Sequence, residues 1–278
     1  MTQTIHILDN VILSQAVFDY LTSHDTISGR IHSIFQNGFN IQCGDYLLYV
    51  SFRKHSLGPF DIQFSQRHFQ TIRPFITIGQ PITLNKIRLK IAGATSCQLS
   101  FYSYHLVDTS LPDVILNRDA LELLLHSLTQ YENDLNSGRH SSKALDETIN
   151  QLNEGTLAFD QFIRMIFGLG IGLTPSGDDM LQSMLVLESV LDSRDQVRLQ
   201  VLESLQLSQT TDVSTSYYHL ILQGFVGQDW RRLLLGLDAT DADAVSASLQ
   251  SILSVGQTSG ADSLLGLVLY LRYLLEVT

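Results

Sequence analysis

The N-terminal part of the chain alternates between apolar and polar residues with the two-residue period of β-strands. The runs RIHSIF and FNIQC flank Asn37-Gly38, a dipeptide typical of hairpin turns, and YLLYVSF follows a second turn at Gly44-Asp45. Alternation returns in KIRLKI and in CQLSFYSYHL. Several short strands separated by turns predict a β-sandwich or a small barrel.

From Asn117 onward the apolar residues follow the helical period. Asn117 is a candidate N-cap for the helix RDALELLLHSLTQYENDL, and a second helix, TLAFDQFIRMIFGLG, is expected to end on Gly168 or Gly170. The last helix is apolar on nearly every side, so we expect it at the centre of a bundle. Further helices are expected near residues 177–192, 195–207, 213–224, 228–237, 241–254 and 260–276.

These patterns predict an α+β fold in which a β-rich, sandwich-like or barrel-like domain (1–110) precedes an all-α helical domain (111–278). Charge supports this division. Residues 1–108 hold eight Lys and Arg against six Asp and Glu, a net charge of +2, whereas the remaining residues carry −13. The total of −11 argues against a nucleic-acid partner, which would require phosphate neutralisation.

The sequence also bears on the compartment. Its two cysteines are not spaced as CxxC, and reduced thiols in the cytoplasm are the expectation. The N-terminus MTQTIHILDNVIL has no basic region or cleavage site of a signal peptide. The longest apolar run, LLGLVLYL, is too short to span a bilayer. We therefore expect a cytoplasmic protein without a membrane partner.

The stretch GLGIGLTPSGDDML (168–181) combines several glycines, which make the backbone flexible, with two adjacent carboxylates at the start of a predicted helix. It is not a dinucleotide fingerprint, because a helix precedes it and the glycine spacing differs. It is not a P-loop either, because Asp178 and Asp179 replace the lysine and hydroxyl, and carboxylates repel phosphate unless a cation lies between.

A helix N-terminus used as a binding site is the third interpretation. Either Thr174 caps the helix with Pro175 as its first residue, or Ser176 caps it and Asp179 completes an acidic capping box. In both cases the free N–H groups and the helix dipole favour an anion nearby. The alternative is that the aspartates only satisfy the helix end.

The pattern recurs near the C-terminus in VGQTSGADSLLGLVLYL. We expect the two helix starts to face one another, although two ordinary capping boxes remain the alternative. A third start, in QTTDVSTSYYHLILQG, offers Thr210, Thr211 and Ser214, and three such starts suggest an oxyanion pocket. Under a shift of 83 residues the matching positions are Ser176 with Ser259, Gly177 with Gly260, Asp179 with Asp262 and Leu181 with Leu264.

Other catalytic patterns are missing from the sequence. No histidine pair has zinc-binding spacing, and no G-x-S-x-G nucleophile motif occurs.

The motifs resemble those of the bacterial AllH family. GLGIGLTPSGDDML resembles its GLTPSGDD signature, and GRIHSIFQNGFNI resembles its N-terminal segment. TTDVSTSYYHLILQG and GQTSGADSLLGL resemble two further segments. One departure is that the family's usual histidine and serine in the last segment are Gln257 and Thr258 here. Any role of that histidine is therefore absent from this chain.

The resemblance implies a subunit of oxamate carbamoyltransferase, acting with two other subunits in allantoin and purine breakdown. That enzyme interconverts oxalurate and phosphate with oxamate and carbamoyl phosphate. Phosphate sites favour arginine, but the motifs contain none. Arg30 or a residue of a partner subunit is therefore the candidate for this arginine. The alternatives are a protein that binds or senses a small anion without turnover, and a structural subunit whose glycines serve helix packing.

The motifs nominate specific residues. Asp178, Asp179 and Asp262 are the candidate catalytic residues, and Asp178 and Asp179 are also candidate ligands of Mg²⁺, the one cofactor considered. The candidate residues for binding the small anionic substrate, of which the resemblance contributes the last two, are Thr174, Ser176, Gly177, Thr210, Thr211, Ser214, Ser259, Gly260, His32 and Asn40.

Overall fold

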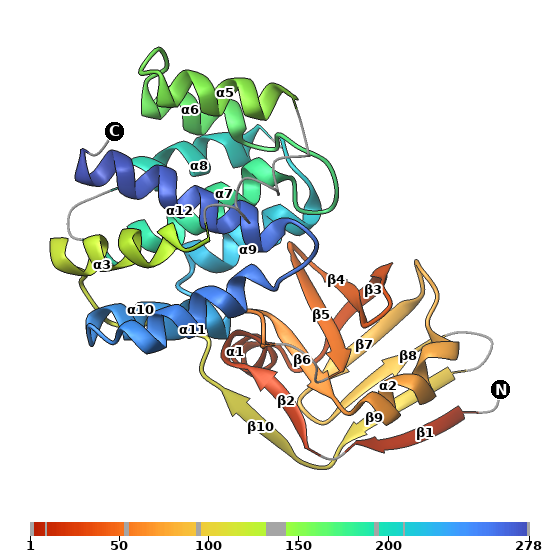
Figure 1. Ribbon diagram of the computed structural model, residues 1–278. Coiled ribbons are helices and arrows are strands. Elements are labelled where there is room, and N and C mark those ends of the chain that lie inside the picture. The colour runs from red at the N-terminus through yellow and green to blue at the C-terminus, as the bar shows by residue number, and fades with distance from the viewer. Residues whose placement is uncertain are drawn as a thin grey trace. The chain divides into compact units, whose positions relative to one another are not determined.

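The computed structural model describes residues 3–8, 10–52, 56–92, 96–131, 143–191, 195–207 and 209–276. Its elements form two compact units (Figure 1). The β unit comprises Met1–Ser110 with Phe225–Gln228, and the helical unit comprises Leu111–Gly224 with Asp229–Thr278. The predicted α+β fold is confirmed.

In the described residues, the β unit is built on one ten-stranded sheet with two α-helices and a short 3-10 helix. Its strands are mostly antiparallel, and their order in the sheet is β1-β9-β8-β7-β3-β4-β5-β6-β2-β10. The elements are β1 (Gln3–Leu8), β2 (Val11–Ser14), α1 (Gln15–Ser23), β3 (Ile27–Ile34), β4 (Gly38–Cys43), β5 (Tyr46–Phe52), β6 (Asp61–Phe64), α2 (Gln66–Ile72), η1 (Arg73–Phe75), β7 (Pro81–Asn85), β8 (Arg88–Ile91), β9 (Ser96–Phe101) and β10 (Tyr104–Val107).

The sheet curls back on itself. β1 lies at one edge and β10 at the other, yet β1 leads almost directly into β2, which pairs with β10. At this corner the N–H of Tyr102 donates to the carbonyl of Leu8 (2.8 Å), and the N–H of Val11 donates to that of Ser103 (3.1 Å). The two edges therefore meet, as the predicted barrel-like architecture requires.

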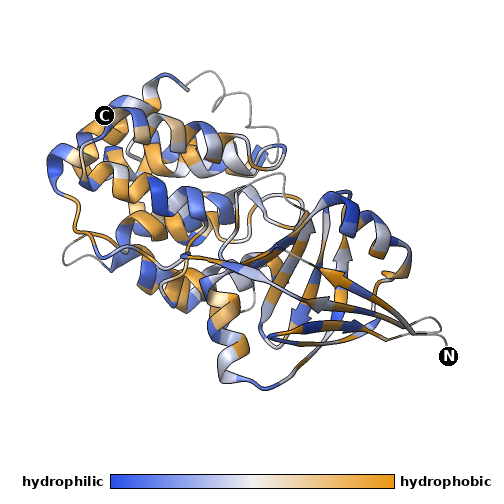
Figure 2. Ribbon diagram, turned by 90° about the horizontal axis from the view of Figure 1, so that it is seen from below, coloured by the Kyte–Doolittle hydropathy of each residue, from blue (hydrophilic) through white to orange (hydrophobic). Residues whose placement is uncertain are grey.

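The predicted hairpins are present. β3 and β4 pair antiparallel across Asn37-Gly38, with an irregularity between Ile31 and Ser33, and β4 pairs with β5 across the Gly44 turn. Figure 2 shows both hydrophobic and hydrophilic residues along the strands of this unit. One face supplies the core, whose fully buried members include Ile31, Phe39, Ile41, Leu48, Val50, Ile62 and Phe64.

The helical unit contains most of the predicted helices, but its helix over Lys143–Asn153 was not predicted. Asn117 caps its first helix as expected, because its side-chain oxygen accepts from the N–H of Ala120 at 3.0 Å. Its described helices are α3 (Arg118–Thr129), α5 (Lys143–Asn153), α6 (Phe159–Ile166), α7 (Ser176–Glu188), α8 (Gln196–Gln206), α9 (Asp212–Leu222), α10 (Gln228–Asp238, whose first residue belongs to the β unit), α11 (Ala242–Leu253) and α12 (Ser259–Leu275).

α7 and α12 form the centre of this unit and run parallel, side by side (Figure 1). Gly266 of α12 lies directly against the backbone of Met180, where an added Cβ would stand 2.5 Å from the carbonyl oxygen. Farther along, the Tyr270 hydroxyl donates to Glu188 Oε1 at 2.9 Å. Because the two helices run parallel, their starts lie at the same end of the bundle.

Among the described residues, no helix combines the length and the hydropathy needed to cross a membrane. The two cysteines, Cys43 and Cys97, are free and buried.

Candidate functional site

The starts of α7 and α12 are built alike. Pro175 and Thr258 occupy the N-cap positions, neither with a side-chain cap, so Ser176 and Ser259 are the first residues of their helices. Both capping alternatives considered for the first helix, and the capping box in each copy, are therefore wrong. The serine and the aspartate that could form a capping box within one helix are instead hydrogen-bonded to the aspartate and the serine of the other helix.

The two starts face one another, as the sequence repeat predicted. The Thr174 and Ser259 hydroxyl oxygens lie 3.1 Å apart. Hydrogen bonds from Ser259 and Thr174 reach the Asp179 carboxyl group, and hydrogen bonds from Ser176 and Thr258 reach that of Asp262. Each helix thus supplies a serine to the aspartate of the other, a reciprocal arrangement that follows from the repeat.

The two crossed carboxyl groups are deeply buried. Asp179 is 5% exposed and Asp262 is 3% exposed. Burial raises the pKa of Asp179 well above its usual range, and the nearby charges of Asp262 and Asp178 raise it further. Burial also raises the pKa of Asp262, against the hydrogen bonds from its serine and threonine. Both carboxyl groups therefore hold their protons at higher pH than an exposed aspartate does.

Each of these carboxyl groups has one oxygen that no described residue pairs by a hydrogen bond. The Oδ2 atoms of Asp179 and Asp262 are buried, and neither has a partner among the described residues. The same holds for the Ser214 hydroxyl and for Gln182 Nε2. Buried polar atoms are normally hydrogen-bonded. The two unpaired carboxyl oxygens, at corresponding positions of the sequence repeat, therefore indicate a binding site.

Asp178 is arranged differently from its neighbour. Its Oδ1 accepts from the Gly168 N–H at 2.9 Å and from the Tyr218 hydroxyl at 3.0 Å, and its Oδ2 accepts from the Thr210 hydroxyl. Its side chain is fully buried, and burial together with the Asp178 charge raises the pKa of Tyr218. Asp178 thereby joins the glycine-rich loop, α7 and α9.

The glycine-rich loop packs its backbone directly under the start of α7. A Cβ on Gly177 would stand 1.8 Å from the Ile166 carbonyl oxygen, and one on Gly170, whose φ is +131°, would stand 2.6 Å from the Ser176 nitrogen. The Gly177 N–H donates to the Leu169 carbonyl at 2.9 Å. Glycine is required here for close packing within the protein, and this N–H is already paired.

The third hydroxyl-rich start belongs to α9. Thr211 is its N-cap, accepting from the Ser214 N–H at 3.1 Å and donating to the Leu173 carbonyl at 2.5 Å. Through Thr210 and Thr211, α9 is fastened to the glycine-rich loop and to Asp178. The predicted residues of the three helix starts thus share one region of the helical unit.

His32 and Asn40 belong to the β unit. Asn40 Nδ2 donates to the Ser33 hydroxyl at 3.1 Å, and that hydroxyl lies 3.2 Å from His32 Nδ1. The two residues lie on the paired strands β3 and β4, where the irregularity after Ile31 shifts the register. This unit therefore brings its own two candidates together around Ser33.

Sequence reasoning missed Tyr218 and Gln182. Tyr218 lies one helical turn after Ser214, so the predicted helix already placed both on one face. Gln182 lies one turn after Asp178 and Asp179 in α7. Helical spacing from a nominated residue was the signal that could have identified each of them.

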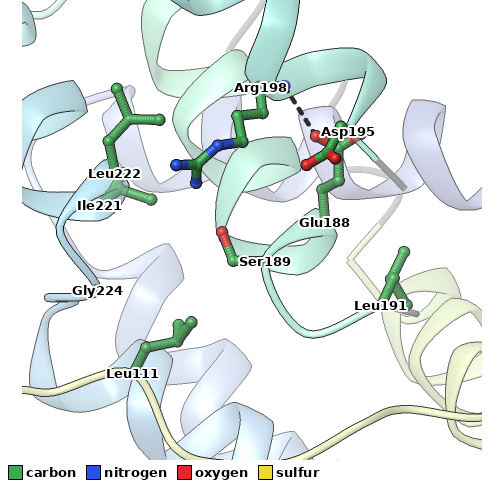
Figure 3. A pocket seen from close by; sticks show the side chains of 9 residues that line it. All are labelled: Leu111, Glu188, Ser189, Leu191, Asp195, Arg198, Ile221, Leu222 and Gly224. Carbon is green, nitrogen blue, oxygen red and sulfur yellow. Dashed lines mark hydrogen bonds between the residues drawn. The ribbon is translucent and has the colours of Figure 1, made fainter. Parts of the chain in front are cut away.

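A separate cavity of about 280 Å³ lies in the helical unit and includes none of the predicted site residues (Figure 3). Glu188, Ser189 and Arg198 are among its lining residues. The Glu188 carboxylate accepts from the N–H groups of Val197 and Arg198 at 2.9 and 2.8 Å, and so caps the start of α8. Among the described residues, no group of three or more acidic, histidine or cysteine side chains could hold a metal ion.

Two family models match the chain. The AllH family N-terminal domain matches residues 8–103, and the model described as oxamate carbamoyltransferase subunit AllH matches residues 166–271. No solved structure matches the chain. The two matched ranges include His32 and Asn40 in one unit and all three helix starts in the other. Because together they span most of its length, the chain belongs to the AllH family.

Proposed function

We propose that the chain is a subunit of an oxamate carbamoyltransferase and that the facing starts of α7 and α12 contribute to its active site. The description of the family supports the subunit role. The proposed reaction converts oxalurate and phosphate into oxamate and carbamoyl phosphate, or the reverse. Two further subunits complete the enzyme, which we place in the cytoplasm and in purine breakdown.

The observation that carries the site is the buried carboxyl group of Asp179 with one open oxygen. In this transfer, the bond between the carbamoyl carbon and the oxamate nitrogen breaks while that carbon bonds to a phosphate oxygen. The leaving nitrogen takes up a proton. A carboxyl group whose pKa is raised by burial retains a proton that it can give to this nitrogen and take back in the reverse direction.

The contacts of the other candidate residues suggest different roles for them. Asp262 is the partner of Asp179, and Asp178 is proposed as a positioning residue, because its oxygens already hold the loop and α9. Mg²⁺ at Asp178 and Asp179 stays a prediction, and no step depends on it. The substrate-binding candidates remain Thr174, Ser176, Gly177, Thr210, Thr211, Ser214, Ser259 and Gly260 in the helical unit, with His32 and Asn40 in the β unit.

The partner subunits supply the groups that these motifs lack. Phosphate and carboxylate groups are bound best by arginine, and the three helix-start motifs contain none. We therefore expect the partners to contribute the basic part of the active site.

Activity of the reconstituted complex tests the proposal. The chain, assembled with its two partner subunits, should form carbamoyl phosphate from oxalurate and phosphate. Asp179→Asn keeps the size of the side chain but removes the transferable proton, so we expect kcat to fall by about 100-fold or more. Carbamoyl phosphate production is the measurement.

Asp243→Asn is the matched control. Asp243 also lies in the first turn of a helix, α11, but is exposed. It should leave the rate unchanged. Full activity of Asp179→Asn would refute the site, whereas an inactive wild-type complex that still binds a small anion would favour the sensing alternative.

A further inference from the structure

The open atoms at the two facing helix starts are hydrogen-bond acceptors. Asp179 and Asp262 each direct one carboxyl oxygen to a serine and a threonine, and each leaves Oδ2 without a partner among the described residues. Both side chains are more than nine-tenths buried. A pair of buried, unpartnered acceptors calls for a ligand that brings donors.

The two glycine N–H groups that an anion could use at these starts are already engaged. The Gly177 N–H donates to the Leu169 carbonyl at 2.9 Å, and the Gly260 N–H donates to the Val255 carbonyl at 3.0 Å. The hydroxyl groups of the two starts bond to the two aspartates. Asp178, Asp179 and Asp262 form no ion pair with any described lysine or arginine. Three buried carboxyl groups without a cation disfavour an anionic ligand.

We infer that the Asp179–Asp262 pair binds the –CO–NH₂ group of the substrate through its N–H donors, and not the phosphate or carboxylate group. The inference rests on the proposed function and names the part of the substrate that this site takes. An NH₂ group carries two N–H donors, which matches the two open oxygens in number. Oxamate carries such a group at the nitrogen to which Asp179 is proposed to give its proton, whereas phosphate and oxalate carry none.

An amide also fits this pair in either protonation state. An ionised carboxyl group accepts from the amide N–H, and a protonated one can also donate to the amide carbonyl oxygen. A purely anionic ligand offers acceptors alone and pairs only with the protonated form.

Oxamate and oxalate provide the test, because oxamate carries an NH₂ group where oxalate carries an oxygen of a second, charged carboxylate. Both are titrated calorimetrically into the assembled complex. The wild type should bind oxamate at least about tenfold more tightly than oxalate. Carbamoyl phosphate production, measured separately, reports on the proposed function.

The Asp179→Asn variant tests whether Asp179 is the acceptor for the amide. Its amide oxygen can accept from Ser259 and Thr174, which turns its NH₂ toward the open position and replaces an acceptor with a donor. The preference for oxamate should fall about tenfold, and oxalate should bind better than before. Asp243→Asn should leave the ratio unchanged, and thermal unfolding of each variant verifies that it is folded.

Several outcomes would overturn the inference. Equal affinity for oxamate and oxalate, no oxamate binding by the wild type, or an unchanged ratio in Asp179→Asn would each do so. A response to Mg²⁺ alone that disappears in Asp179→Asn would mark a cation site instead. A complex that prefers oxamate as expected but makes no carbamoyl phosphate would refute the proposed function and leave the amide site standing.

Discussion

Asp178 and Asp179 are adjacent in the chain and yet serve different neighbours. Successive residues of an α-helix are rotated by about 100°, so adjacent side chains leave the helix in different directions. Asp178 bonds to the glycine-rich loop and α9, whereas Asp179 receives a hydrogen bond from α12. The sequence predicted that both mattered but not that their roles differ, because their partners are distant in the chain.

The raised pKa of Asp179 makes stability depend on pH. Above about pH 4, the usual pKa of an unfolded aspartate, the unfolded chain releases a proton that folded Asp179 retains. The free energy of unfolding of the wild type, relative to Asp179→Asn, should therefore fall as pH rises from 4 through the raised pKa. The slope can approach about 1.4 kcal/mol per pH unit.

Urea denaturation of both proteins at pH 5, 6 and 7 measures this difference. Asn at this position does not titrate, so pH effects common to both proteins cancel. A difference that stays constant or grows with pH would show that Asp179 is not a protonated, buried carboxyl group in the folded protein.

At the scale of elements, the helical pattern was the most informative part of the sequence. The helix predicted over 260–276 is α12 (Ser259–Leu275), and that over 241–254 is α11 (Ala242–Leu253). The prediction of the β region was less complete. The pattern did not predict α1 or α2, and CQLSFYSYHL, which alternates throughout, forms two strands that break at Tyr102-Ser103. Local alternation does not record where a sheet must turn a corner.

The contact between α7 and α12 depends on Gly266. A Cβ there would stand 2.5 Å from the Met180 carbonyl oxygen and 2.6 Å from its Cα, both backbone atoms that cannot rotate away. Gly266→Ala should force the helices apart and destabilise the protein by roughly 1–3 kcal/mol, despite the better helix propensity of alanine. Chemical denaturation measures the change.

Gly236→Ala in α10 is the matched helical control. Its Cβ would meet the Ala244 Cβ and the Val245 backbone nitrogen at 3.3 Å, so the neighbours need to shift by only a few tenths of an ångström. The change in unfolding free energy should be near zero or favourable, because alanine suits a helix better. Equal effects of the two substitutions would contradict the role of Gly266.

At the scale of the whole molecule, the chain enters the β unit twice. After α9 it returns for four residues, Phe225–Gln228, before continuing the helical unit. There the Val226 N–H donates to the Thr109 carbonyl at 2.8 Å, and the Gln228 N–H donates to the Leu57 carbonyl at 2.9 Å. Val226 is buried. No local pattern predicted this return, because its partners lie more than a hundred residues away.

A split protein tests the return segment. Fragments 1–110 and 111–278, produced together, should remain associated, since residues 225–228 of the second fragment complete the β unit of the first. Val226→Asp places a charge at a buried position and should weaken the association, as measured by copurification. The exposed substitution Val255→Asp is the control. Fragments that separate without any substitution would contradict the expectation.

The return segment also orders events during synthesis. A ribosome makes the chain from its N-terminus, so all ten strands emerge long before residues 225–228 do. The β unit obtains its last backbone partners only when 228 of the 278 residues have been translated. Until then Thr109 and Leu57 lack their final hydrogen bonds, and the helices up to α9 are made while the β unit is still incomplete.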